Sequence, residues 1–390
     1  MKNTSKVYIL ALISFLVGTS NYIISGILDQ IAETLGISVA VAGQLITVYS
    51  LSYAVGTPIL MALTAKMDRR KLLLYSLGLF IFANLLTFIL PGLGLFIAAR
   101  ILMALGAGMV TVTALSIAAQ IAPPGKQASF IATVTIGITA SLIIGVPLGR
   151  IVATAFGWKA VFLAIAILGV LAMPVIAAAF PRMQGDKPVP LVKQLALLKK
   201  PQVFVALAVT FFWLGGYSLA YTYISPFLLE VTHLDKSLIS AALLVFGIAS
   251  LIGSKVGGYS TDKRGIIFTL ISGMVLHTIS LILLSIVGHS VIVVFAILIL
   301  WSFAAWSSGP TQQFNLVSLV PESSGVMLSL NSSVMQLAMA VGAGFGGLII
   351  NRISLASITW FGAFGVIIAI IATFILSSMA PRHSQVQSAD

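Results

Sequence analysis

Twelve long apolar runs dominate the sequence, and polar or turn-forming residues separate them. A helix needs about 20 apolar residues to cross a hydrocarbon core about 30 Å thick, and glycine or proline stands between several runs, as at Pro91-Gly92 and Gly157. Predicted transmembrane helices cover Val7–Leu28, Ala42–Leu63, Leu72–Leu90, Leu93–Ile121, Phe130–Ala153, Val161–Phe180, Val203–Phe227, Leu238–Tyr259, Ile266–Val287, Val291–Phe314, Val326–Ile350 and Ile358–Met379.

The longest segment between runs, residues 181–202, divides six runs from six. Both halves also place a basic turn between their second and third runs, Lys66–Lys71 and Asp262–Gly265. Repeated halves are typical of secondary transporters. We therefore expect an all-α membrane protein with 12 transmembrane helices in two pseudo-symmetric six-helix bundles, residues 1–180 and 203–390, joined by a cytoplasmic linker over 181–202.

Lysine and arginine are distributed unequally between the two sides of this arrangement. Cytoplasmic loops carry an excess of these residues. Only Arg150, Lys159, Lys236 and Arg352 would lie opposite the termini, and Arg100 lies within the fourth run. The side of the termini holds Lys2, Lys6, Lys66, Arg69, Arg70, Lys71, Lys126, Arg182, Lys187, Lys193, Lys199, Lys200, Lys255, Lys263, Arg264 and Arg382. Both termini are therefore predicted to be cytoplasmic.

Composition excludes several classes of protein. The chain is 59% hydrophobic and 8% charged, whereas a soluble domain has about 25% charged residues. The excess of lysine and arginine in the loops on one side of the membrane accounts for the net charge of +12, so we expect no nucleic-acid partner. The absence of cysteine and the scatter of four histidines argue against a metal site. We expect a lipid bilayer around the chain, no cofactor and no enzymatic activity.

Arg100 is the most costly residue to place in lipid, at about 2.5–3.5 kcal/mol on the insertion scale. It would lie at the same depth as Asn21, which shares one helix face with Ser25 and Asp29. We expect this face to meet Arg100 beside a water-accessible cavity. Asn21 and Ser25 would then contact substrate, while Asp29 and Arg100 would couple transport to protons. A structural arginine that reaches the membrane interface is the alternative.

A second candidate for substrate contact is the aromatic stripe of Trp213, Tyr217 and Tyr221, which Ser225 continues, all spaced four residues apart on the seventh run. Such side chains offer a flat apolar face and a hydrogen-bonding tip; packing or an interfacial belt is the alternative. His277 is expected to be a helix contact rather than a proton relay. Further polar groups that would be unfavourable in lipid, some of which should line the pathway, are Trp306, Gln312, Gln313, Asn331 and Gln336.

Three short segments are candidates for gating. A carboxylate beside cations at a helix end can hold two helices together and release them, and glycines beside a proline allow close packing and bending. Ordinary loops and ordinary packing are the alternatives. The gating candidates are Gly258, Asp262 and Lys263; Asp68, Arg69 and Arg70; and Gly145, Pro147 and Gly149.

The turn Gly258–Gly265 resembles the G-x-x-x-D-[RK]-x-G signature of the major facilitator superfamily, and Gly145-Val146-Pro147-Leu148-Gly149 resembles its antiporter motif. The resemblance extends over nearly the whole chain and is strongest to bacterial arabinose-efflux-permease-type exporters in the drug and metabolite branch. It implies a monomer in the bacterial inner membrane and a substrate such as a sugar, nucleobase, nucleoside or drug. The chain has Asn21 where relatives commonly have glutamate, and Asp29 where they have proline.

These observations lead to three hypotheses. The first is a proton-coupled exporter of a small molecule that works by alternating access. The second is an uncoupled uniporter of an uncharged polar solute, favoured by the scarcity of acids within the runs. The third is a membrane sensor or scaffold that does not transport, for which the short tail from Arg382 and the linker offer little material.

Overall fold

The computed structural model describes residues 3–89, 92–123, 127–183, 196–287, 290–320 and 324–379. Within these ranges, 12 helices are long and apolar enough to cross a membrane, as the sequence predicted. Many of them expose large apolar side chains, among them Leu171, Ile292 and Phe364, at 61%, 81% and 61% exposure. Because lipid rather than water suits such surfaces, the fold is that of a multi-pass membrane protein.

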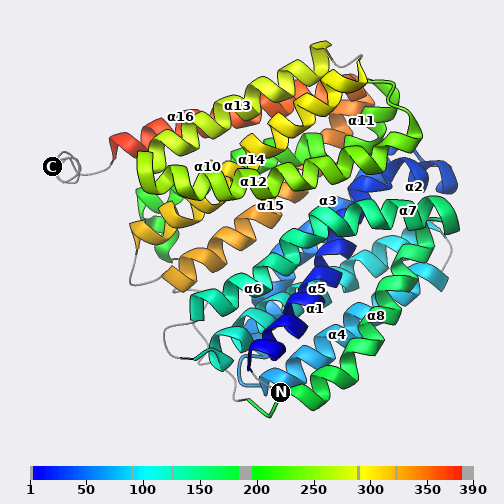
Figure 1. Ribbon diagram of the computed structural model, residues 1–390, viewed down its shortest axis with the longest axis vertical. Helices are drawn as coiled ribbons and strands as arrows, with labels where there is room; N and C mark the ends of the chain where they lie inside the picture. The colour runs from blue at the N-terminus through cyan, green and yellow to red at the C-terminus, as the bar shows by residue number, and fades with distance from the viewer. Residues whose placement is uncertain are drawn as a thin grey trace.

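The helices form two groups, the lower and upper halves of Figure 1. The N-terminal half contains α1 (Asn3–Gly26), α2 (Leu28–Leu35), α3 (Val39–Leu63), α4 (Arg69–Ile89), α5 (Leu93–Ile121), α6 (Gln127–Ala140), the π-helical turn η1 (Ser141–Gly145), α7 (Val146–Phe156) and α8 (Trp158–Ala179). The C-terminal half contains η2 (Leu197–Lys199), α10 (Pro201–Tyr221), α11 (Ile224–Glu230), η3 (Lys236–Leu238), α12 (Ile239–Arg264), α13 (Ile266–Val287), α14 (Val291–Leu319), α15 (Ser324–Arg352), η5 (Leu355–Ser357) and α16 (Ile358–Ser378). Most of the linker, 184–195, lies outside the described residues.

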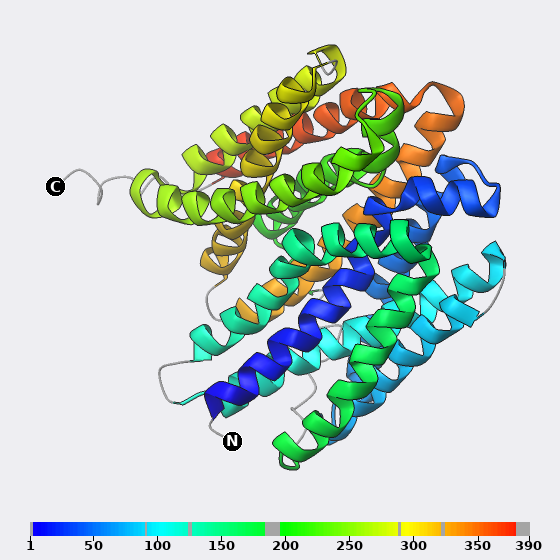
Figure 2. The same cartoon turned by 45° about the vertical axis from the view of Figure 1, so that its right-hand side comes forward.

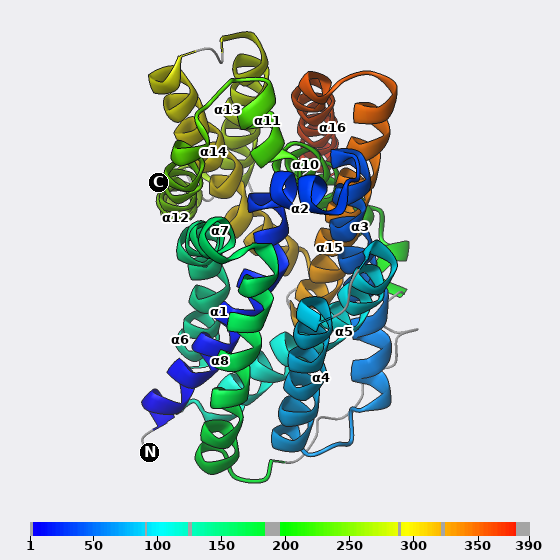
Figure 3. The ribbon, with the colours of Figure 1, turned by 90° about the vertical axis from the view of Figure 1, so that its right-hand side faces the viewer.

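Two short helices, α2 and α11, mark one end of the long helices, and we call that end the α2 face (Figure 3). The opposite end, where α8 ends and α10 begins, is the linker face. At the α2 face the chain turns sharply after α2, where Gly36 adopts φ 63° and its N–H caps the helix. A left-handed conformation of this kind favours glycine. Ser38 then begins α3 by accepting a hydrogen bond from the Val41 N–H.

The halves contact each other through α3 with α15, through η1 and α7 with α12, and through α2 with α11. Figure 2, turned by 45° from Figure 1, shows α2 and the end of α7 beside the upper half. Two contacts are close enough to need glycine. Gly43 of α3 lies against the Tyr223 ring, and a Cβ at Gly247 of α12 would lie 2.5 Å from the Ile143 Cα in η1. The two halves are therefore packed together at the α2 face.

Candidate functional site

An ion pair at the α2 face joins three helices from both halves. Arg150 on α7 donates to Asp29 on α2 through two hydrogen bonds, of 2.8 and 3.0 Å. Ser225 on α11 donates to Asp29 Oδ1 at 2.6 Å and accepts from Arg150 Nη1 at 2.7 Å. Arg150 also donates to the Gly26 carbonyl. Asp29 and Arg150 belong to the N-terminal half, so Ser225 is the contribution of the C-terminal half.

Local breaks in the helices place these side chains. A bend at Ile27 ends α1, so Asp29 falls in the first turn of α2, where a negative charge is favourable. α2 buries Leu28, Ile31 and Ala32 and thereby fixes the orientation of Asp29. In the C-terminal half, α10 ends at Tyr221, and Ser225 lies in the first turn of the separate helix α11. Each half therefore presents its group from a short helix at the end of a span.

The Asp29 carboxylate is held in its charged form. Burial raises the pKa of Asp29, but the hydrogen bonds and charge of Arg150, together with the Ser225 hydrogen bond, outweigh burial and hold the pKa below its usual value. Side-chain exposure is 3% for Arg150 and 15% for Asp29. The two hydrogen bonds between Arg150 and Asp29, together with the hydrogen bond from Ser225, offset the free-energy cost of burying these charges. At neutral pH the site is therefore an intact ion pair.

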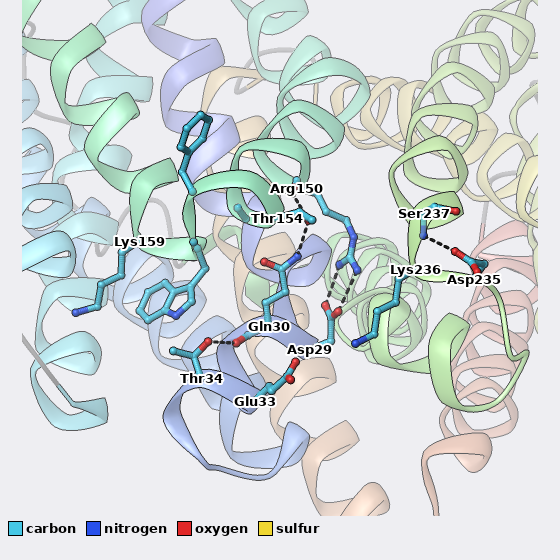
Figure 4. A pocket seen from close by; sticks show the side chains of 14 residues that line it. Asp29, Gln30, Glu33, Thr34, Arg150, Thr154, Lys159, Asp235, Lys236 and Ser237 are labelled. Carbon is cyan, nitrogen blue, oxygen red and sulfur yellow. Dashed lines mark hydrogen bonds and ion pairs between the residues drawn. The ribbon is translucent and has the colours of Figure 1, made fainter.

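A pocket of about 860 Å³ opens above this ion pair, between the halves (Figure 4). Within it, Gln30 Nε2 donates to Thr154 Oγ1 at 3.1 Å. The lining comprises Asp29, Gln30, Glu33, Thr34, Arg150, Ala153, Thr154, Phe156, Gly157, Trp158 and Lys159 from the N-terminal half and Asp235, Lys236 and Ser237 from the C-terminal half. The pocket connects Asp29 with the medium at the α2 face.

The predicted pairing of Asp29 with Arg100 is wrong. The bend at Ile27 takes Asp29 off the face that carries Asn21 and Ser25, and Asp29 pairs with Arg150 instead. Arg150 was not predicted as a site residue, because its charge was attributed to a loop at the end of the fifth run. The available signal was its position at the end of the fifth span, at the same membrane depth as Asp29.

Arg100 is enclosed in the N-terminal half rather than open to a cavity, with an exposure of 0%. Its Nη1 donates to the Ser20 carbonyl at 3.0 Å, and its guanidinium lies 4.1 Å from the centroid of the Tyr49 ring. The partial negative charges of the carbonyl and the aromatic face replace the counter-ion. Arg100 therefore meets α1, as predicted, but through the backbone of Ser20 rather than through Asp29.

Some of the predicted substrate residues remain without polar partners. Among the described residues, Asn21 Oδ1, Trp213 Nε1 and Gln336 Oε1 are buried atoms with no hydrogen-bond partner. Ser25 is also buried, on α1. An unsatisfied buried polar group costs about 1–3 kcal/mol. Such atoms on helices of both halves would gain most from a ligand, or from a second conformation that supplies partners.

The aromatic stripe forms a cluster in the C-terminal half. The Tyr217 and Tyr221 rings stack with centroids 5.2 Å apart, and Trp306 meets Tyr217 edge-on at 6.0 Å. His277 is buried 6.2 Å from the Tyr217 ring, and neither of its ring nitrogens has a hydrogen-bond partner among the described residues, so it is not the hydrogen-bonded helix contact that was expected. Phe246 of α12 and Trp301 of α14 also lie near the Tyr217 ring, with centroids 6.4 and 5.9 Å away. The cluster therefore joins several helices of the C-terminal half.

Two other predicted substrate residues lie elsewhere. Asn331 accepts a 2.9 Å hydrogen bond from Thr210, and Gln312 donates to that same hydroxyl at 3.0 Å. This buried network ties α10, α14 and α15 together and was not predicted. Gln313, the neighbour of Gln312, is exposed on α14. The geometry thus gives Asn331 a role in packing within the C-terminal half.

Comparison with known proteins decides the family. The profile of the Major Facilitator Superfamily matches residues 10–343. The chain belongs to this superfamily. It is 66% identical to the uncharacterized MFS-type transporter YbcL of Bacillus subtilis (strain 168) over 98% of each chain. It is 28% identical to a probable sugar efflux transporter of Pasteurella multocida (strain Pm70) over 97% of this chain and 94% of that protein.

The fold agrees with that membership. A crystal structure of a bacterial homologue of the human lysosomal transporter Spinster, in an inward-facing and occupied conformation, matches with a TM-score of 0.79 at 16% identity over 97% of each chain. A likeness at this identity concerns the fold alone. Together these comparisons show a multi-pass transporter of the Major Facilitator Superfamily, and not an enzyme.

The signature turns of this superfamily lie at the linker face. Asp262 and Lys263 are exposed at the end of α12, and in the part of the chain that the structure describes Asp262 makes no bond to the N-terminal half. An added Cβ at Gly258 would meet nothing, so close packing does not require this glycine. A bridging role for this turn stays a prediction that belongs to another conformation.

The first-half turn instead organises its own half. Asp68 accepts hydrogen bonds from the Lys71 N–H at 2.8 Å and the Met183 N–H at 2.7 Å, and the Arg69 N–H donates to the Met183 carbonyl at 2.9 Å. Arg69 is buried, and Arg70 is half-buried beside it. Asp68 thus caps α4 and attaches the start of the linker to it.

The antiporter-like segment packs against α1 and the C-terminal half. A Cβ at Gly145 would meet Thr19, and one at Gly149 would meet Ile23, both on α1. The chain forms the π-helical turn η1 just before Pro147, and π-turns often mark functional positions in helices. Because η1 contacts Gly247 of α12, the segment lies at the boundary between the two halves.

Proposed function

We propose that this transporter exports a small, uncharged polar solute by alternating access, in exchange for protons. The linker face is then cytoplasmic, since Lys66, Arg69, Arg70, Lys263 and Arg264 lie at that end. The α2 face is external and, in this conformation, closed. The membrane would be the bacterial inner membrane, and the chain would act as a monomer, because one chain supplies both halves.

One observation carries the proton coupling. Among the carboxylates that the structure describes, Asp29 alone is bonded to both halves, through Arg150 and Ser225. Glu33, Glu230, Asp235 and Asp262 are exposed. A group whose protonation changes an inter-half contact shifts the equilibrium between conformations by its differential binding of protons. Asp29 takes this role with Arg150 as its partner, while Arg100 would hold α1 in place for it.

The groups left without partners support the proposed substrate class. Asn21 and Gln336 offer amide groups from opposite halves, and the Tyr217 cluster offers aromatic faces. Amides paired with aromatic faces suit a polyhydroxylated or heterocyclic solute. The similarity to a probable sugar efflux transporter supports testing sugars first.

Purified protein in a thermal-shift screen against sugars, nucleosides, nucleobases, amino acids and antibiotics identifies the ligand, because a bound ligand raises the apparent stability. Proteoliposomes then test the coupling. An acidic compartment on the α2 side should drive the solute into that compartment, and a protonophore should abolish its accumulation. The same result with an amino acid in place of a sugar or nucleoside would change the substrate class but keep the coupling.

The uniporter remains a second candidate, because no described carboxylate lies in the central part of a span. It predicts movement of solute down its own gradient only. Equal initial rates with and without a pH gradient, together with no accumulation, would select the uniporter.

A further inference from the structure

We infer that Ser225 is the positioning residue through which the Asp29–Arg150 ion pair holds the α2 face closed. This inference deepens the proposed alternating-access function and rests on it, but it does not require that protons drive transport. Ser225 bonds to both members of the pair, as donor to Asp29 and as acceptor from Arg150.

Three of the four bonded groups at this site belong to the same half of the protein. Asp29, Arg150 and the Gly26 carbonyl all belong to the N-terminal half, so their mutual bonds persist when the halves separate. The two bonds of Ser225 are the ones at this site that must break. The ion pair therefore stabilises the closed conformation through its two hydrogen bonds with the Ser225 hydroxyl.

The strength of those bonds gives the second argument. A hydroxyl that donates to a carboxylate at 2.6 Å makes a charge-assisted bond, about twice as strong as a neutral one. Ser225 is completely buried, so water does not replace either bond while the halves are closed. Protonation of Asp29 removes the charged acceptor and releases the bidentate grip that aims Arg150 at Ser225. Acid should therefore weaken closure.

The pocket supplies access for that proton. Asp29 faces Arg150 on α7 and Ser225 on α11, and the pocket around it is lined by Glu33 on α2, Lys159 on α8, and Asp235 and Lys236 at η3. Three cations and two further acids thus surround the carboxylate. Because the pocket opens at the α2 face, the proton that weakens closure reaches Asp29 from that side.

Spin-label distances test the inference directly, and the sequence contains no cysteine that would interfere. Labels at Phe156→Cys on α7 and Glu230→Cys on α11 report on the α2 face, since both positions are exposed and lie in different halves. Labels at Lys66→Cys and Arg264→Cys, also exposed, report on the linker face. Rocking of the halves changes the two distances in opposite senses.

In Ser225→Ala we expect the open population at the α2 face to rise about tenfold at pH 7.5, because a charge-assisted bond is lost. The response to acid between pH 7.5 and 3.5, a range that passes below the usual aspartate pKa of about 4, should shrink. Ser225→Thr keeps the hydroxyl and should restore both properties. Ser218→Ala is the matched control, because that buried serine bonds within its own half, to the Met339 carbonyl, at 3.1 Å.

A distance distribution and acid response in Ser225→Ala equal to those of the parent protein would overturn the inference. If Ser225→Ala does not fold, Asp29→Asn in the same labelled protein gives the answer, since it removes the charged acceptor and should open the α2 face at pH 7.5. The outcome is separable from the proposed function. If the distances change in Ser225→Ala but transport does not respond to the pH gradient, the role of Ser225 in closure stands and proton coupling is rejected.

Discussion

Gly43 and Tyr223 pack against each other across the boundary between the two halves. The Tyr223 ring, fully buried, occupies the space where a Cβ of Gly43 would stand, and its hydroxyl donates to the Ala343 carbonyl on α15 at 2.7 Å. Gly346 of α15 borders the same ring. The closed α2 face thus depends on a ring held between helices of opposite halves, in addition to the ion pair.

Gly43→Ala should favour separation at the α2 face. The added methyl group overlaps the Tyr223 ring only while the halves are in contact, and overpacking of this kind costs about 1–3 kcal/mol. The distance between spin labels at Phe156→Cys and Glu230→Cys should lengthen in a larger share of the molecules. Gly78→Ala is the control, since its Cβ would lie 3.9 Å from Met173. Equal distance distributions in the two variants would show that this contact does not limit opening.

Arg150→Gln should shift the pH dependence of transport toward higher pH. The pKa of Asp29 is lowered because the bonds and charge of Arg150 and the bond of Ser225 outweigh burial. The stabilising contribution of the charged pair is therefore present at neutral pH and is lost as the pH falls through that lowered pKa. Without the cation, burial dominates and protonation occurs at higher pH. Initial rates measured from pH 3.5 to 8.5 check this, with Lys236→Gln as the control at the pocket rim.

Tyr49→Leu should destabilise the protein while Tyr49→Phe should not. Arg100 is enclosed, and the Tyr49 ring is one of the few groups that offset its charge. A desolvated cation–π contact contributes about 2 kcal/mol, and phenylalanine retains the ring. Thermal unfolding in detergent measures the difference. A phenylalanine variant as unstable as the leucine variant would assign the effect to the hydroxyl instead.

Asn331→Ala should lower stability more than it changes substrate affinity. Its side chain accepts from Thr210 inside the C-terminal half, and removal leaves that buried hydroxyl without its acceptor at a cost of about 1–3 kcal/mol. Gln313→Ala, at an exposed position on α14, should cost less than about 0.5 kcal/mol. A large rise in apparent KM with unchanged unfolding temperature would instead return Asn331 to the substrate site.

The sequence predicted the spans because each is a continuous apolar run, a signal that lipid makes obligatory. The sequence did not predict the breaks between helices that are shorter than one helical turn. The bend at Ile27 moved Asp29 away from the stripe of Asn21 and Ser25, and the end of α10 at Tyr221 separated Ser225 from the aromatic stripe. Helical periodicity cannot anticipate such breaks, because the four-residue spacing of these side chains continues through both of them.

The sequence predicted the membrane depth of the two arginines better than it predicted which of them pairs with Asp29. Arg100 and Arg150 are both cations near the α2 side of the membrane, and the sequence gives no rule for which of them meets Asp29. The structure decides through packing: α7 places Arg150 beside α2, while α5 directs Arg100 into the N-terminal half, where carbonyls and a ring compensate for it. Which arginine meets Asp29 depends on the distances between helices that are far apart in the sequence.

The most direct test of proton coupling at Asp29 compares two transport modes in proteoliposomes containing Asp29→Asn. Asparagine keeps the shape and a hydrogen-bond acceptor but cannot carry the proton. The account predicts that accumulation driven by a pH gradient is lost, while exchange of labelled for unlabelled solute at equal pH persists. Accumulation by Asp29→Asn at the rate of the parent protein would contradict the account.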